Sequence, residues 1–95
     1  MTVKVNPEFQ QWNYTNITTN TTTLVKTGSG VLHSITVNTT SAGSIKIEDA
    51  LTDTTPLIGT LKASVAEGTY RYDVAFTTGL NIVTAGASDI TVAWA

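Results

Sequence analysis

The sequence predicts an all-β protein, and three observations carry this prediction. Twenty of the 95 residues are threonine, and with valine and isoleucine they make the chain rich in β-branched side chains, which suit pleated strands better than helices. No stretch has apolar residues at the i, i+3, i+4, i+7 spacing over three turns, so helix is confined at most to a turn around residues 7–11. Short segments with a period of two recur instead.

The clearest predicted strand covers residues 70–76. Its large side chains alternate with polar or small ones, so one face carries Tyr70, Tyr72, Val74 and Phe76 and the other carries Arg71, Asp73 and Ala75. This period is typical of a half-buried strand, whose large side chains pack in a core. Residues 77–79 break the pattern, and a second strand over residues 80–84 is expected after this tight turn.

Similar segments predict five further strands, at residues 22–26, 31–38, 44–51, 57–62 and 89–94. Turn residues bound each of them. Gly28, Gly30, Gly43 and Gly68 can supply positive φ in these turns, and Pro56 suits the first position of a strand, where its missing N–H is harmless.

The number and spacing of these segments predict the architecture. Seven or eight short strands with regular turn signals favour a two-sheet β-sandwich or a small barrel. Strand pattern alone does not separate jelly-roll from immunoglobulin-like topology. The absence of cysteine removes the paired cysteines that mark true immunoglobulin domains, so we predict a β-sandwich of jelly-roll type.

The chain is expected to divide into an N-terminal arm or edge segment, residues 1–20, and a β-sandwich domain, residues 21–95. In the first segment, Phe9, Trp12 and Tyr14 stand among polar residues without sustained alternation. Large aromatic side chains dominate interface hot spots, so these three residues are the predicted partner interface. Trp12 could equally stack on a sugar ring or hold the arm against the domain.

Strand parity also predicts positions for His33 and Trp94. Trp94 has the parity of the other apolar residues in the last strand and is expected in the core. His33 matches the parity of Val31, Ile35 and Val37. We interpret this single histidine as a strand residue at a sheet margin or an interface, because a catalytic triad needs a nucleophile, a base and an orienting group within hydrogen-bond reach.

The remaining side chains indicate neither catalysis nor a metal. Glu48 and Asp49 are adjacent on a predicted strand and point to opposite faces, so they cannot form the facing carboxylate pair of a glycosidase. With one histidine and no cysteine, a zinc site lacks its ligands, and a loop calcium near Glu48, Asp49 and Asp53 has no supporting motif. We expect no enzyme activity, no cofactor and no metal site.

Charge and hydropathy argue against nucleic acid and membranes as partners. Five lysines and arginines against seven aspartates and glutamates leave a net charge of −2, with no basic run. No apolar run approaches the roughly 20 residues that span a bilayer, and the first ten residues lack the features of a signal peptide. A soluble protein without a secretion signal of its own is expected. Because 95 residues give only a thin core, self-association is one way to bury more apolar surface.

Three blocks of the sequence, in order and spacing, resemble a small all-β protein type found in tailed bacteriophages. The blocks are TTTLVKTGSGVLHSITVNTT at 21–40, SIKIEDALTDTTPLIGTL at 44–61 and YRYDVAFTTGLNIVTAGASDITVAW at 70–94. Members of this type are virion-associated and similar to capsid decoration or cement proteins, with jelly-roll-like domains that oligomerise on the outside of a shell.

This resemblance implies a virion structural protein on the capsid surface, made in the cytoplasm of the host. It implies the major capsid protein or another virion protein as partner, together with further copies of the chain in a dimer or trimer. The sequence leaves two alternatives open: a carbohydrate-binding module and a tail- or fibre-associated module. The resemblance covers residues 21–94 and identifies no contact residue.

Overall fold

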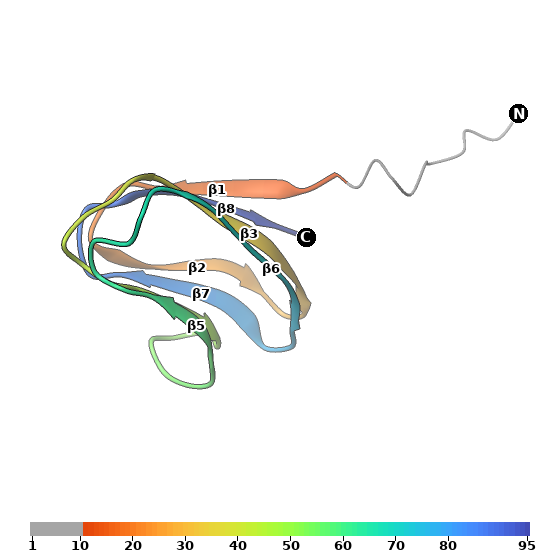
Figure 1. Cartoon of the computed structure of the whole chain (residues 1–95). Helices are drawn as coiled ribbons and strands as arrows, with labels where there is room; N and C mark the ends of the chain where they lie inside the picture. Colours follow the sequence, from red (N-terminus) through yellow and green to blue (C-terminus); the bar gives the residue numbers. More distant parts are fainter. Residues whose placement is uncertain (1–10) are drawn as a thin grey trace, which may run out of the picture.

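The computed structural model describes residues 11–95, which form eight β-strands and no helix (Figure 1). The all-β prediction is therefore confirmed. The strands are β1 (Asn13–Ile17), β2 (Thr21–Thr27), β3 (Gly30–Thr39), β4 (Ile45–Asp49), β5 (Leu57–Leu61), β6 (Gly68–Phe76), β7 (Gly79–Thr84) and β8 (Asp89–Trp94).

Seven of these strands coincide, within two residues at each end, with the seven segments that alternation predicts. The remaining strand, β1, lies within residues 1–20 and is hydrogen-bonded to β8 at the edge of its sheet. The turn expected around residues 7–11 falls, apart from Gln11, outside the described residues.

The strands form two antiparallel sheets that pack face to face. Sheet I has the order β1-β8-β3-β6, and sheet II has the order β2-β7-β4-β5. Figure 1 shows sheet I above sheet II, with the loop between β4 and β5 hanging below. The predicted two-sheet β-sandwich is confirmed.

The path of the chain is that of one long antiparallel hairpin. Its hydrogen-bonded partners are nested, with β4 against β5, β3 against β6, β2 against β7 and β1 against β8. Successive pairs alternate between sheet II and sheet I. Each outer face is therefore assembled from segments that are far apart in the sequence.

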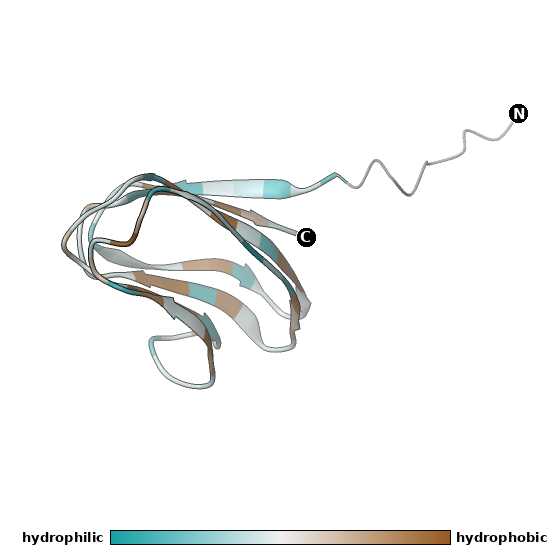
Figure 2. Ribbon diagram, viewed as in Figure 1, coloured by the Kyte–Doolittle hydropathy of each residue, from teal (hydrophilic) through white to brown (hydrophobic). Residues whose placement is uncertain are grey.

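Every second side chain along the strands points inward and fills the core between the sheets. Figure 2 shows hydrophobic and hydrophilic bands alternating along β7. Sheet I contributes Ile17, Leu32, Ile35, Val37, Phe76, Ile90 and Val92. Sheet II contributes Ile45, Ile47, Leu61, Leu80 and Ile82. Both faces predicted for residues 70–76 are confirmed, because Phe76 is buried, the tyrosines and Val74 pack partly buried against the core, and the alternate residues are exposed.

A β-bulge in β3 changes the parity that the sequence suggests for His33. Between Leu32 and Ser34 the register shifts against both neighbouring strands, β6 and β8. The core receives Leu32 before the bulge and Ile35 and Val37 after it, whereas His33 lies outside the core. The predicted grouping of His33 with Ile35 and Val37 is wrong, because an extra residue in a strand reverses the alternation beyond it.

Candidate functional site

The sandwich presents two outer faces of different chemistry, one on each sheet. Among residues 11–95, the exposed large hydrophobic side chains are Tyr14, Leu24, Leu51 and Leu57. The three leucines lie on the outer side of sheet II, and we call this surface the leucine face. Tyr14 lies on the outer side of sheet I, which we call the tyrosine face.

The leucine face is organised by strand register. One cross-strand row of sheet II consists of Leu24, Asn81, Glu48 and Leu57. Residues directly opposite each other in an antiparallel pair share a face, and this row alternates with the core residues Ile47 and Ile82. Leu51 joins the same side because it packs over Gly79, where its Cδ2 atom fills the space that a Cβ would need. The leucines are 43% (Leu24), 46% (Leu51) and 51% (Leu57) exposed, so about half of each is free to be covered by a partner.

A buried polar pair lies between the leucines. Glu48 is 1% exposed and Asn81 is 0% exposed. The Asn81 side-chain amide donates to Glu48 Oε1 at 3.0 Å, and the backbone N–H of Thr54 donates to the same oxygen at 3.3 Å. The bond from Thr54 ties the loop between β4 and β5 to sheet II. Asn81 Oδ1 is buried without a hydrogen-bond partner within the described part of the chain.

An exposed ion pair forms the rim of the leucine face. Lys46 Nζ lies 2.7 Å from Asp53 Oδ1 and 3.7 Å from Glu48 Oε2. The hydrogen bond with Asp53 raises the pKa of Lys46, and the same bond lowers the pKa of Asp53. Beside this pair is a shallow, open cavity of about 310 Å³, lined by Lys46, Glu48, Asp53, Thr54, Thr55 and Leu57.

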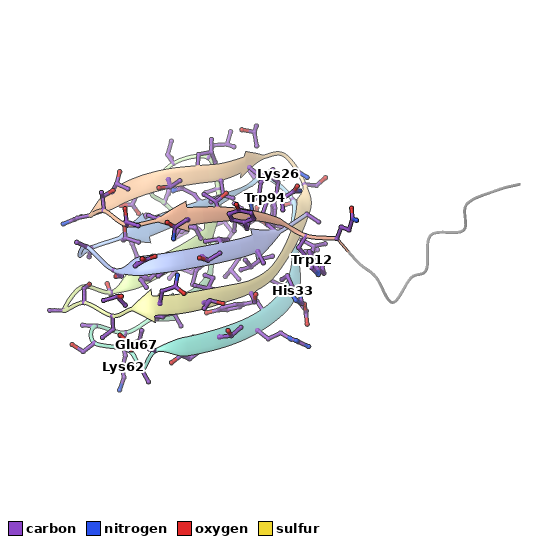
Figure 3. All side chains as sticks on the ribbon, turned by 90° about the horizontal axis from the view of Figure 1, so that it is seen from above. Trp12, Lys26, His33, Lys62, Glu67 and Trp94 are labelled. Atoms are coloured by element: carbon purple, nitrogen blue, oxygen red, sulfur yellow. The ribbon has the colours of Figure 1, made fainter. Side chains whose placement is uncertain are left out.

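The tyrosine face combines two long, exposed side chains with a floor of small ones. One row across sheet I consists of Tyr14, Ala93, Ser34 and Arg71. Tyr14 is 74% exposed, and the Arg71 side chain is 70% exposed. Ala93 and Ser34 occupy the two inner strands, β8 and β3, so the middle of the row stays low. Figure 3 looks down on this side of the molecule, with the four strands of sheet I lying side by side.

Next to this row is a hydrogen-bonded group of small polar side chains, the polar cluster of Asn16, Asn38, Asp89 and Thr91. Asn16 Nδ2 donates to Asp89 Oδ1 at 2.8 Å and to the Ile90 carbonyl at 2.8 Å. Asn38 Nδ2 donates to the same Asp89 oxygen at 3.2 Å and to Thr91 Oγ1 at 3.1 Å. The cluster joins β1, β8 and β3, so its side chains are held in place without a ligand.

The three residues predicted as a partner interface have different positions. Phe9 lies outside the described residues, and Tyr14 is the exposed residue of the tyrosine face. Trp12 is half-buried, and its ring stacks on His33 with centroids 4.2 Å apart (Figure 3). His33 Nδ1 lies 2.5 Å from Asp73 Oδ1. Trp12 is thus held against its own domain, and Tyr14 is the one of the three that is described and freely exposed.

Trp94 packs against the core but is only half-buried, so its expected burial is met in part. Its indole N–H donates to Thr15 Oγ1 at 3.0 Å. Lys26 Nζ, which comes from sheet II, lies 5.9 Å from the centroid of the ring. This contact closes one end of the space between the sheets with an amphipathic pair.

Within residues 11–95, no group of three or more histidine, cysteine, aspartate or glutamate side chains is placed to hold a metal ion. Glu48 and Asp49 have separate partners, since Asp49 accepts the backbone N–H groups of Thr77, Thr78 and Gly79. The same range contains no helix of a length and apolarity that could cross a membrane.

Sequence patterns indicate Tyr14 but neither the leucine face nor the polar cluster. Both depend on which residues stand opposite each other across paired strands, and the alternation within one segment does not carry that information. No family model, curated protein sequence or solved structure matches this chain.

Proposed function

We propose that this protein is a structural protein of a tailed-bacteriophage virion, a decoration or cement protein that binds the outside of the capsid and stabilises the shell. The three sequence blocks at 21–40, 44–61 and 70–94 support the viral origin through their resemblance to small virion proteins. The leucine face is the observation that carries the role, because it gives a small β-sandwich one apolar surface for docking. The proposal assigns no catalytic residue, cofactor or metal.

The composition of the leucine face suits contact with a large protein surface. Its exposed leucines lie beside the exposed Lys46–Asp53 pair, and such a combination of apolar and charged side chains is common in protein interfaces. Covering the exposed half of one leucine contributes about 1 kcal/mol, so the three together contribute about 3 kcal/mol per copy. This is less than the roughly 4–15 kcal/mol lost when two bodies associate. A single copy is therefore expected to bind weakly through this patch alone.

Weak binding by one copy favours a homo-oligomer, which we propose as a dimer or trimer. Several leucine faces on one oligomer can engage neighbouring capsid subunits at the same time. Once one leucine face is bound, binding of the next is effectively intramolecular. This raises the overall affinity although no single contact is stronger. An oligomer that bridges subunits also resists their separation, which is the action expected of a cement protein.

We further infer that the sandwich is wound as a jelly roll. That architecture places eight antiparallel strands in two sheets through two Greek keys. The nested partners β1–β8, β2–β7, β3–β6 and β4–β5, which alternate between the sheets, are the pattern obtained when one long hairpin is wrapped on itself. Jelly-roll winding agrees with the resemblance, because the virion proteins that the three sequence blocks resemble have jelly-roll-like domains.

The direct test is co-sedimentation of the purified protein with undecorated capsid shells of the phage that encodes it, with purified tails as a parallel sample. We expect binding to shells, and we expect Leu24→Ser combined with Leu57→Ser to weaken it. Tyr14→Ser is the matched control, because it removes an exposed apolar side chain from the opposite face.

Three outcomes would overturn the assignment. The wild-type protein could fail to sediment with shells, or it could bind tails in place of shells. The leucine substitutions could also lower the oligomer mass in sedimentation velocity and leave shell binding unchanged, in which case the leucine face is the contact between copies.

A further inference from the structure

We propose that the tyrosine face is a binding site for neutral oligosaccharides, in which Tyr14 stacks on a sugar ring and the polar cluster binds sugar hydroxyl groups. This inference goes beyond the proposed function and does not depend on it, because it concerns the opposite sheet. It rests on the exposure of Tyr14, on the fixed geometry of the polar cluster and on the low floor between Tyr14 and Arg71.

Tyr14 provides the apolar part of such a site. Its side chain is 74% exposed, the largest fraction among the exposed large hydrophobic residues of the described range. Sugar rings have apolar C–H faces that pack on an aromatic ring, while the tyrosine hydroxyl remains free to hydrogen-bond. Because Tyr14 stands on the edge strand β1, a ligand can reach its ring from above and from the side.

The polar cluster provides fixed hydrogen-bond acceptors beside that ring. Both amide groups donate to one oxygen of Asp89, so the second carboxylate oxygen and the carbonyl oxygens of Asn16 and Asn38 can accept from sugar hydroxyls. Asn16 follows Tyr14 by two residues on β1, which places the two side chains on the same face about 7 Å apart. One sugar unit can therefore touch both. Since the cluster is already ordered, binding loses little side-chain entropy.

Small side chains form the floor of the face. Ser34 is 7% exposed, and its hydroxyl is not one of the buried side-chain atoms of the described residues that lack a hydrogen-bond partner. Tyr14 and Arg71 are separated by three strand spacings, about 14 Å, with Ala93 and Ser34 between them. This strip has room for a short oligosaccharide lying across the strands.

Charge distinguishes a sugar from other ligands. Arg71 is the cation of this row, and its Nε lies 3.8 Å from Asp73 Oδ2. Asp89 adds a further carboxylate in the polar cluster, where it is bonded to Asn16, so the surface does not attract a polyanion such as nucleic acid. An extended peptide binds preferentially along a free strand edge, where its backbone is satisfied, whereas this site is a sheet face. A neutral polyol matches the mixture of aromatic ring, amides and hydroxyls.

Together, the two proposals predict the orientation of the sugar site on the virion. The inner sides of sheets I and II pack against each other, so the tyrosine face and the leucine face point to opposite sides of the sandwich (Figure 1). If the leucine face docks on a shell, the tyrosine face points away from the shell. The virion would then display the sugar sites outward in many copies, where weak binding is strengthened by multivalency.

The test uses the isolated protein labelled with ¹⁵N. It is titrated with maltotriose, cellotriose, mannotriose and triacetylchitotriose up to about 10 mM, which nearly saturates a site with a Kd of about 1 mM. We expect saturable shifts of amide signals on β1 and β8 with at least one sugar. Tyr14→Ala should weaken binding about tenfold, the loss expected of a hot-spot tyrosine, and Tyr14→Phe should retain most of it. Leu24→Ser should leave it unchanged.

The proposal is overturned if none of the four sugars gives a saturable shift, or if Tyr14→Ala binds as tightly as the wild type while its amide spectrum shows an intact fold. Stronger shifts of the same signals by heparin would assign the face to anions. Loss of shell binding in Tyr14→Ala would assign it to protein docking and would equally overturn the sugar site.

Discussion

The indole of Trp12 lies parallel to the imidazole of His33, with ring centroids 4.2 Å apart and 6° between the ring planes. Trp12 immediately precedes β1, whereas His33 belongs to β3, and β8 lies between these strands in sheet I. The stack therefore fixes the start of β1 across the width of one strand. Asp73 contacts the imidazole at Nδ1, on the edge of the ring.

Removal of the imidazole should release Trp12. We expect His33→Ala, made in a Trp94→Phe background, to increase quenching of Trp12 fluorescence by acrylamide, because one face of the indole becomes open to solvent. Thr36→Ala is the control, since Thr36 is on the same strand and bonds to Thr69 rather than to Trp12. Equal quenching in His33→Ala and its parent would show that the stack does not persist in solution.

Asp49 should make the free energy of unfolding depend on pH in the acidic range. Its carboxylate accepts the backbone N–H of Thr77, which is the largest cause of its lowered pKa, and those of Thr78 and Gly79. A folded-state pKa below the usual 3.8 means that the stabilisation is present above pH 3.8 and is lost as the pH falls through the lowered value. Urea unfolding at neutral pH should show a loss of about 1–2 kcal/mol in Asp49→Ala, as for other caps of free backbone N–H groups.

Asp53→Asn is the control for this acid dependence. The pKa of Asp53 is also lowered, but by an exposed bond to Lys46, and such surface pairs contribute little to stability. A pH profile of unfolding that is equally flattened by Asp49→Asn and Asp53→Asn would contradict the assignment of the acid sensitivity to the turn before β7.

Features that depend only on neighbouring residues in the sequence could be predicted, and features that depend on pairing between distant strands could not. Alternation identified residues 70–76 as a half-buried strand because each residue's face depends only on its neighbours in that segment. The same counting failed at His33, where a bulge shifts the register against two strands at once. Nothing in Val31 to Val37 marks the bulge, since it is set by pairing with β6 and β8.

Non-local pairing also explains why the functional faces were not predictable. Leu24 and Leu57 share one row only because β2 and β5 flank β7 and β4 in a given register. Residues 13–17 contain a single core side chain, Ile17, so their strand gives no clear apolar alternation. The polar pattern of this strand indicated an aromatic surface residue, Tyr14, but not its neighbours across the sheet.

The buried Glu48–Asn81 pair should stabilise the fold through its hydrogen bonds. Glu48→Ala leaves the buried Asn81 amide without an acceptor, which costs about 1–3 kcal/mol, and it also removes the acceptor of the N–H of Thr54, an exposed residue. Glu48→Gln keeps an acceptor oxygen in the same place, so we expect a clearly smaller loss. Chemical denaturation of both variants decides the point. Equal losses would show that the ion pair with Lys46 matters more than the two hydrogen bonds.

Gly59, on β5 at the edge of sheet II, lies close to the ring of Tyr72, on β6 of sheet I. A Cβ on Gly59 would lie 3.1 Å from both Cε1 and the hydroxyl oxygen of Tyr72, so the ring covers the glycine. Burial raises the pKa of Tyr72 above the usual 10.0, because the ionised phenol loses hydration. Stability is therefore unaffected below pH 10.0 and falls as the pH rises through the raised value.

Gly59→Ala should displace the Tyr72 ring towards solvent. We expect the tyrosinate absorbance assigned to Tyr72, taken as the difference from Tyr72→Phe, to appear at lower pH in Gly59→Ala than in the wild type. The added methyl group should also cost about 1 kcal/mol, the lower end of the range for overpacking, because the ring has an open side towards which it can shift. An unchanged titration together with a large loss of stability would mean that β5 moves and the ring stays in place.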